Sequence, residues 1–108
     1  MDIADWRKQI DELDLKLVEL LNERAAAAKE IGFLKRGAGA PIYEPEREKA
    51  IFNRIREANR GPLPERDLAQ IYERIIDVMR KLQREQIDDA TKTMAASGGT
   101  EIEADADE

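Results

Sequence analysis

Residues 3–36 read IADWRKQIDELDLKLVELLNERAAAAKEIGFLKR, with no proline and a single glycine, Gly32. Apolar side chains recur along this stretch, mostly in steps of three and four. They are Ile3, Trp6, Ile10, Leu13, Leu17, Leu20, Leu21, Ala28, Ile31 and Leu34. That spacing places them on one face of an α-helix. We therefore expect one long amphipathic helix, roughly 50 Å in length at a rise of about 1.5 Å per residue.

Two breaks divide the rest of the chain. The run Gly37–Pro41 ends the long helix. Pro45 suits the first position of a second helix, because the N–H that proline lacks is not needed there, and we expect this helix to reach about Asn59. After the break Asn59–Pro64, a third helix should fade after Gln86. Its apolar residues at helical spacing are Leu68, Ile71, Tyr72, Ile75, Ile76, Met79 and Leu82.

This pattern predicts an all-α fold with one long and two shorter helices. Residues 1–90 should form the domain, and residues 91–108, which are small, polar and acidic, should be disordered. A helix of roughly 50 Å is far longer than a compact domain of about 90 residues, whose radius of gyration is about 12 Å. Small cores often need oligomerisation as a supplement. We expect a homodimer in which the long helices pair, and the alternative is an elongated monomeric bundle.

Composition limits the chemistry and the partners. The 108 residues include no cysteine and no histidine, which excludes a disulfide framework, a thiolate metal site and the usual general base near neutral pH. A net charge of −6 with mixed signs argues against nucleic-acid binding. No apolar run approaches the roughly 20 residues of a membrane span. The charged N-terminus is unlike a signal peptide, so a soluble, cytoplasmic protein is the expectation.

Two cations interrupt the apolar face of the long helix. With Arg24 set to zero, Lys35 lies at about +20° and Ile31 at about −20° on the helical wheel. A buried, unpaired cation is costly, so an anion must meet these side chains. Either internal carboxylates, Glu44 and Glu48, or a bound anion would serve, and the sequence leaves both possibilities open.

Other polar residues fall near these cations. Glu44, Arg47 and Glu48 occupy the first turns of the second helix, where carboxylates favour the helix dipole and free N–H groups suit an anion. Gln83 follows Met79 on one face of the third helix, a position more often exposed than functional. Arg7 lies about 25 Å from Arg24 along the helix axis. It therefore cannot share a site with Arg24 within one straight helix, although it could do so across an antiparallel dimer.

Three segments then suggest a family: WRKQIDELDLKLVELLNERAAAAKEIGFLK, IYEPEREKAIF and IIDVMRKLQ, in this order over about residues 5–86. Together they closely resemble the all-helical class of chorismate mutases, known as type II. The most specific feature is an ordered combination of residues, namely Arg7, Arg24, Lys35, Glu44-x-x-Arg47-Glu48 and Gln83. The resemblance implies three helices per chain, intertwined as a homodimer, with each active site drawing on both chains.

The resemblance also implies a reaction, the intramolecular Claisen rearrangement of chorismate to prephenate in aromatic amino-acid biosynthesis. It needs no metal, cofactor, nucleophile or proton transfer. By resemblance, Lys35, Gln83, Arg24 and Glu48 are the catalytic residues. Arg7 of the partner and Arg24 would bind carboxylates, and Lys35 would donate to one carboxylate and to the ether oxygen. Gln83 would donate to the ether oxygen from the other side, and Glu48 would accept a hydrogen bond from the ring hydroxyl. The rest of the substrate site would be Arg47, Glu44, Ile31, Ile76 and Met79.

Two positions depart from the family pattern. Met79 stands where the family commonly has a small hydroxyl residue, so we expect weaker substrate binding or a compensating backbone donor. At the position of Glu44 the family often has Asp.

At the position of Gln83 some members of the family have Glu. Because an amide donates a hydrogen bond at every ordinary pH, we expect that activity does not require acid conditions.

Three alternatives remain at this stage. One is isochorismate pyruvate lyase, which shares the fold and the cationic pocket. The second is a regulatory or assembly module that associates with a shikimate-pathway enzyme. The third is a purely structural helical dimer with salt-bridged surfaces.

Overall fold

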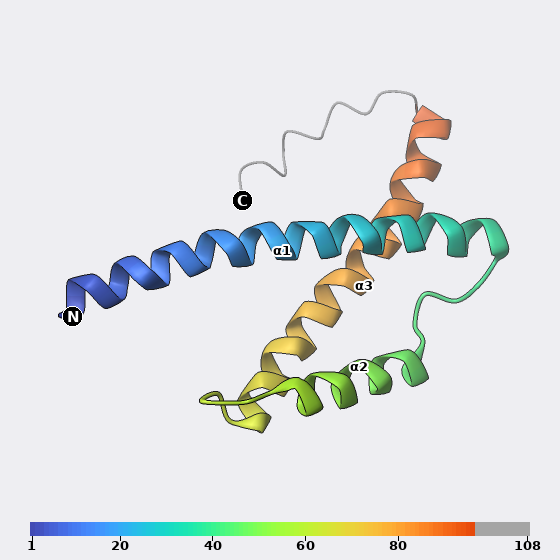
Figure 1. Ribbon diagram of the computed structural model, residues 1–108. Helices are drawn as coiled ribbons and strands as arrows, with labels where there is room; N and C mark the ends of the chain where they lie inside the picture. The colour runs from blue at the N-terminus through green and yellow to red at the C-terminus, as the bar shows by residue number, and fades with distance from the viewer. Residues whose placement is uncertain (97–108) are drawn as a thin grey trace.

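The computed structural model describes the fold of residues 1–96 and the side chains of residues 1–85. Figure 1 shows three helices, which are α1 (Ile3–Ala38), α2 (Pro45–Ala58) and α3 (Glu65–Ala96), and no strand occurs in this part of the chain. The all-α prediction is thereby confirmed. The two later helices are both shorter than α1, as predicted: α1 has 36 residues, α2 has 14 and α3 has 32, so α3 is only slightly the shorter.

Local signals at both ends fix the limits of α1. The Asp2 side chain accepts a hydrogen bond from the Asp5 backbone N–H at 2.9 Å, and the Asp5 side chain accepts one from the Asp2 N–H at 3.1 Å. This reciprocal capping box satisfies N–H groups that have no partner inside the helix. At the other end Gly39 adopts a left-handed conformation, with φ of 67°, that favours glycine and ends the helix.

The other two helices begin where the sequence predicts, but α3 ends later than predicted. Pro45 is the first residue of α2, as predicted, and α3 begins one residue after Pro64. The expected end of α3 near Gln86 is wrong, because the helix continues to Ala96, past the domain limit expected at residue 90. Neither glycine nor proline occurs between Pro64 and Gly98, so nothing local stops the helix. The remainder of the predicted acidic tail, residues 97–108, lies outside the described residues.

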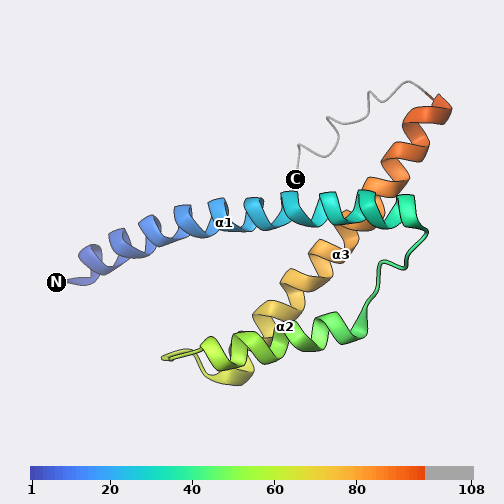
Figure 2. The ribbon, with the colours of Figure 1, turned by 45° about the vertical axis from the view of Figure 1, so that its right-hand side comes forward.

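The helices form an open arrangement. In the described part of the chain α3 packs against both α1 and α2, and α1 and α2 do not pack on each other. In both ribbon views α3 crosses the C-terminal half of α1, and the N-terminal half of α1 projects away from the other helices (Figures 1 and 2). The radius of gyration is 17.7 Å, well above the value of about 13 Å for a compact chain of 100 residues.

The core lies where α1 and α3 cross. Ala28, Ile76 and Met79 are the buried apolar residues, and Gly32 is buried beside them. A Cβ atom on Gly32 would lie 3.1 Å from the Cα atom of Gln83, so the two helices approach closely here only because residue 32 has no side chain. The crossing therefore fixes the position of Gln83 relative to α1.

The apolar face of α1 is uncovered over its N-terminal half. Six large apolar side chains there are between 50% and 67% exposed. We name them the N-terminal stripe: Ile3, Trp6, Ile10, Leu13, Leu17 and Leu20. Contiguous exposed apolar surface of this kind marks an interaction site. Among the described helices, none is both long enough and apolar enough to cross a bilayer.

Candidate active site

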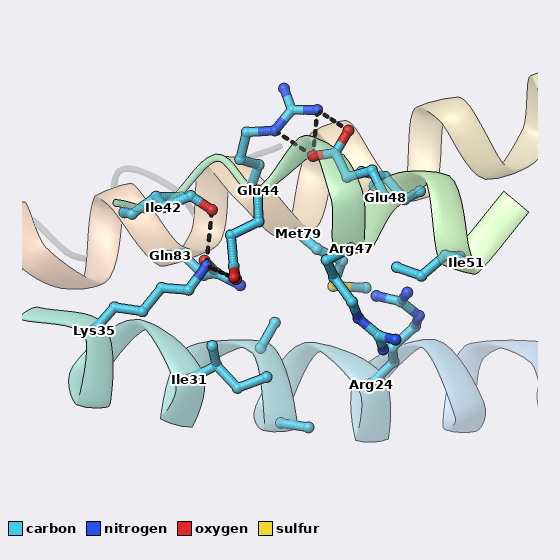
Figure 3. A pocket seen from close by; sticks show the side chains of 14 residues that line it. Arg24, Ile31, Lys35, Ile42, Glu44, Arg47, Glu48, Ile51, Met79 and Gln83 are labelled. Carbon is cyan, nitrogen blue, oxygen red and sulfur yellow. Dashed lines mark hydrogen bonds and ion pairs between the residues drawn. The ribbon is translucent and has the colours of Figure 1, made fainter. Parts of the chain in front are cut away.

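A cavity of about 350 Å³ lies between the C-terminal half of α1, the start of α2 and the middle of α3 (Figure 3). Its volume is in the range of small-molecule sites. Every predicted site residue except Arg7 lines it. The lining residues are Arg24, Ala27, Ala28, Ile31 and Lys35 of α1, Ile42 and Glu44 before α2, Arg47, Glu48 and Ile51 of α2, and Ile76, Met79, Arg80 and Gln83 of α3.

Lys35 is held by the loop that follows α1. Its side chain is only 13% exposed, and its Nζ donates to the Ile42 carbonyl oxygen at 2.8 Å and lies 2.8 Å from Glu44 Oε1. An internal carboxylate thus meets this cation, one of the two possibilities that the sequence left open. An ammonium has three donors, so one remains for a ligand.

Arg24 and Arg47 are in a different situation. Both side chains extend into the same part of the cavity (Figure 3), and neither forms an ion pair within the described side chains, residues 1–85. Two guanidinium groups side by side repel each other unless an anion lies between them. For Arg24 the second possibility, a bound anion, is therefore the one that the geometry favours.

Glu48 pairs with a residue that the sequence reasoning missed. Arg80 donates from Nε to Glu48 Oε2 and from Nη2 to Glu48 Oε1, both at 3.0 Å. The sequence signal for Arg80 was its spacing, because it follows Ile76 by four residues and precedes Gln83 by three. That spacing places it on the inward face of α3.

Gln83 lines the cavity where α3 crosses α1, against Gly32. Its side-chain oxygen is buried and has no hydrogen-bond partner in the described part of the chain. Leaving a buried acceptor unpaired costs free energy, so this oxygen is available to accept a hydrogen bond from a ligand, while the donor of the same amide is its Nε2 group. Ile76 and Met79, 6% and 7% exposed, supply apolar contact next to it.

Arg7 lies outside the cavity. It is exposed on the N-terminal half of α1, in the part that projects away from α2 and α3 (Figure 1). This placement agrees with the expectation that Arg7 and Arg24 cannot share a site within one chain.

The arrangement suits a small anion with an apolar body. Four cations and two carboxylates line the cavity, so its net charge is +2. These are Arg24, Lys35, Arg47 and Arg80, and Glu44 and Glu48. Guanidinium groups match carboxylates in geometry, and Lys35 and the Gln83 amide, which line the same cavity, carry further donor groups. No group of acidic side chains in the described range could hold a metal ion.

Fold and cavity together define an all-helical protein with a cationic site for a small molecule. Residues 6–84 match the family described as chorismate mutase type II. The chain is 40% identical over 87 residues to a bifunctional chorismate mutase/prephenate dehydratase of Aquifex aeolicus, covering 77% of this chain and 24% of that protein. It is 34% identical over 88 residues to a chorismate mutase of Methanocaldococcus jannaschii, covering 81% of this chain and 89% of that one.

A solved structure agrees with these relatives. The fold is similar, with a TM-score of 0.74 and 30% identity, to a chorismate mutase of Helicobacter pylori in complex with prephenate, over 80% of this chain and 93% of that one. The chain belongs to the chorismate mutase type II family. It spans about a quarter of the length of the bifunctional Aquifex relative.

Proposed function

We propose that this chain catalyses the rearrangement of chorismate to prephenate. One observation carries the proposal: the cavity of this family member brings Arg24 and Arg47, two guanidinium groups with no counterion among the side chains of residues 1–85, next to Lys35 and Gln83. Chorismate is a compact dicarboxylate, and its charge matches the net +2 of the cavity.

The proposed mechanism is positioning plus stabilisation of developing charge. The rearrangement breaks an ether bond and forms a carbon–carbon bond within one molecule, so no residue has to attack or exchange a proton. Arg24 and Arg47 would hold a carboxylate of the substrate in the compact geometry that the reaction needs. Lys35 and Gln83 would donate to the ether oxygen as negative charge builds on it, a contribution typically worth 10²–10³-fold per donor.

The remaining residues would orient the ring. Glu48 would accept a hydrogen bond from the ring hydroxyl, and the backbone at Glu44 would complete the polar wall. Ile31 and Ile76 would pack against the ring faces. Met79 has a thioether in place of a hydroxyl donor, so we expect substrate binding to be weaker than a hydroxyl residue would give.

We further propose a homodimer with shared sites. The N-terminal stripe is exposed, and Arg7 lies on the same half of α1, away from its own cavity. Pairing two α1 helices in antiparallel directions would cover the stripe and bring Arg7 of each chain toward the cavity of the other. Homo-oligomers with a two-fold axis form such self-complementary contacts.

A role beside another enzyme is the second candidate. It is favoured by the bifunctional relatives, in which a chorismate mutase occurs together with prephenate dehydratase. On this hypothesis the isolated chain would be a weak enzyme whose turnover rises when a shikimate-pathway enzyme is added.

The test is an assay of the purified chain with two substrates. We expect chorismate to be consumed with formation of prephenate, and isochorismate to give little or no pyruvate. Pyruvate release from isochorismate without prephenate formation would instead identify an isochorismate pyruvate lyase. Failure with both substrates, in a chain that circular dichroism finds folded, would overturn the proposed function.

A further inference from the structure

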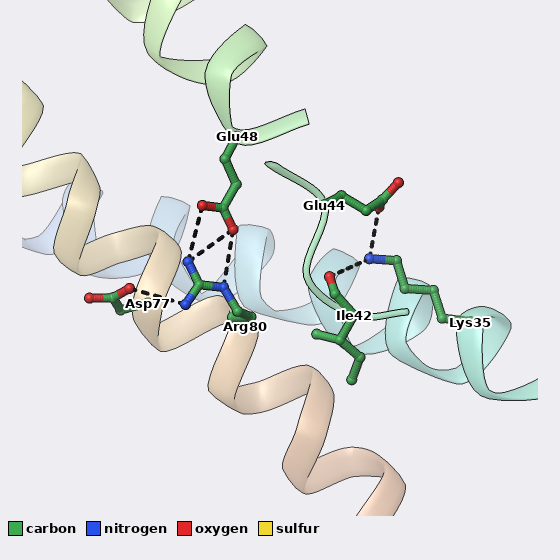
Figure 4. A network of polar contacts seen from close by, with 6 residues as sticks. All are labelled: Lys35, Ile42, Glu44, Glu48, Asp77 and Arg80. Atoms are coloured by element: carbon green, nitrogen blue, oxygen red, sulfur yellow. Dashed lines mark hydrogen bonds and ion pairs between the residues drawn. The ribbon is translucent and has the colours of Figure 1, made fainter. Parts of the chain in front are cut away.

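The Arg80–Glu48 pair is the best-formed ion pair in the described part of the chain. Figure 4 shows the guanidinium of Arg80 facing the carboxylate of Glu48, with Nε to Oε2 and Nη2 to Oε1 both at 3.0 Å. Both side chains are mostly covered, at 23% and 20% exposure. This two-point geometry fixes the plane of the carboxylate as well as its position.

Arg80 is itself held on two further sides. Asp77, one turn earlier on α3, places Oδ1 at 3.4 Å from Arg80 Nη1. The ring of Tyr43, from the loop before α2, lies with its centroid 5.2 Å from the Arg80 Cζ atom, within the range of a cation–π contact. Because Asp77 and Tyr43 restrain the guanidinium, it in turn restrains Glu48.

The contrast with the other carboxylate of the cavity is informative. Glu44 is 52% exposed and meets Lys35 at one oxygen only. Glu44 can therefore turn towards solvent, whereas Glu48 is held at the wall between α2 and α3.

We propose that Arg80 is a positioning residue for the rearrangement: it fixes the Glu48 carboxylate so that an oxygen of it accepts the ring hydroxyl of the bound substrate. The inference rests on the proposed function. A carboxylate has about four lone-pair positions, and the two bonds from Arg80 leave room for a further donor. Arg80 makes its contact through Glu48 and not through the reacting atoms.

Charge gives Arg80 a second effect. Glu48 carries a negative charge next to a site for a dianion, and without compensation it would repel the substrate carboxylates. With Arg80 the cavity has a net charge of +2, and without Arg80 this falls to +1. Arg80 thus allows the site to keep an acceptor for the hydroxyl while still attracting a dicarboxylate.

The positioning effect and the charge effect of Arg80 can be distinguished by measuring kcat and KM separately. The experiment measures kcat and KM for wild type, Arg80→Met, Arg80→Lys, Glu48→Gln and the double variant Arg80→Met/Glu48→Gln. The substrates are chorismate and an analogue that lacks the ring hydroxyl. Arg74→Met is the matched control, since Arg74 is exposed on the same helix. Thermal melting followed by circular dichroism reports on folding.

For Arg80→Met we expect kcat on chorismate to fall about 10- to 100-fold, the order of loss that misplacing a site group by about 1 Å produces. On the analogue, kcat should stay within about threefold of wild type, while KM rises on both substrates. In the Glu48→Gln background, adding Arg80→Met should change kcat by less than about threefold, because the carboxylate that Arg80 positions is no longer present. Arg74→Met should match wild type.

Arg80→Lys keeps the charge and loses the two-point geometry, so its KM should stay near wild type while its kcat falls by an intermediate factor. It also keeps the inference testable if Arg80→Met does not fold. Wild-type kcat in both Arg80 variants would overturn the inference, and so would equal losses with and without Glu48. An inactive wild type would instead refute the proposed function, so the two failures are distinguishable.

Discussion

The two halves of α1 carry the same apolar periodicity in different surroundings. In the C-terminal half, α3 crosses the apolar face, buries Ala28 and Gly32, and closes the cavity around Arg24 and Lys35. In the N-terminal half the same face is open, and Trp6 and its neighbours are at least half exposed.

What differs between the halves is therefore the partner and not the helix. Within residues 1–96, one chain supplies a packing partner, α3, for only half of its longest helix. The chain also places one predicted substrate residue, Arg7, on the half that has no partner. The two facts have one explanation if a second copy of α1 covers the N-terminal stripe, and the predictions below test each half in turn.

The largest loss of activity is expected when charged residues are introduced into the N-terminal half of α1. The double substitution Leu13→Asp/Leu17→Asp would bury two carboxylates in the proposed dimer contact, which is costly without counterions. We expect sedimentation velocity to find monomers and activity to fall on the order of 10³-fold, because each site then lacks the Arg7 of a partner. Leu15→Asp is the matched control, since Leu15 is 73% exposed on the opposite face. Dissociation by Leu15→Asp alone would mean that the interface lies elsewhere.

The next largest loss of activity should come from removing the cations in the C-terminal half of α1. Arg24→Ala and Lys35→Ala should each lower kcat/KM about 10²–10³-fold, the usual result of removing one preorganised donor. Lys29→Ala, an exposed cation on the same helix, should leave turnover unchanged. If the chain were only a structural helical dimer, removing these awkward cations would have little effect or would stabilise it. Losses below about tenfold for both variants would contradict the mechanism.

A smaller loss of activity is expected from a substitution where the C-terminal half of α1 crosses α3. Gly32→Ala would place a Cβ atom 3.1 Å from the Gln83 Cα atom, so α3 must shift. Overpacking of this kind lowers the free energy of unfolding by about 1–3 kcal/mol. The better helix propensity of alanine offsets about 1 kcal/mol of this loss. We expect a loss of kcat near tenfold from the displaced Gln83, measured beside the melting temperature. Gly37→Ala, which meets no atom within 4 Å, should have no effect on kcat.

The smallest effect should come from pH. An amide does not titrate in the ordinary range, so kcat should be nearly flat between about pH 6 and pH 8. In Gln83→Glu, a carboxyl donates only when it is protonated, so the rate should rise as the pH falls. A wild-type rate that collapsed over this interval while the chain stayed folded would remove Gln83 from its proposed role.

Sequence reasoning succeeded where local signals decide the structure. The break at Gly37–Pro41 and the position of Pro45 mark helix ends through backbone conformation, and helical spacing placed Arg24 and Lys35 on one face. The end of α3 was missed because apolar content falls after Gln86, although no helix breaker occurs before Gly98.

Side-chain pairing was harder to predict, because it depends on the path of the loop between α1 and α2. Lys35 and Arg24 look equivalent on the helical wheel, but the loop brings Glu44 only to Lys35. Arg80 was missed for the same reason. Its bonds to Glu48 join residues 32 positions apart in the sequence, which no local pattern reveals.

The central claim is that each site combines the C-terminal half of α1 of one chain with the N-terminal half of α1 of the other chain. Subunit mixing tests this claim most directly. Arg7→Ala and Arg24→Ala would be purified separately, each almost inactive, and then unfolded and refolded together in equal amounts. Half of the dimers should then be mixed, and each mixed dimer should have one intact site, which restores about a quarter of wild-type activity. No recovery above the separate variants, in a sample shown to contain mixed dimers, would contradict the account.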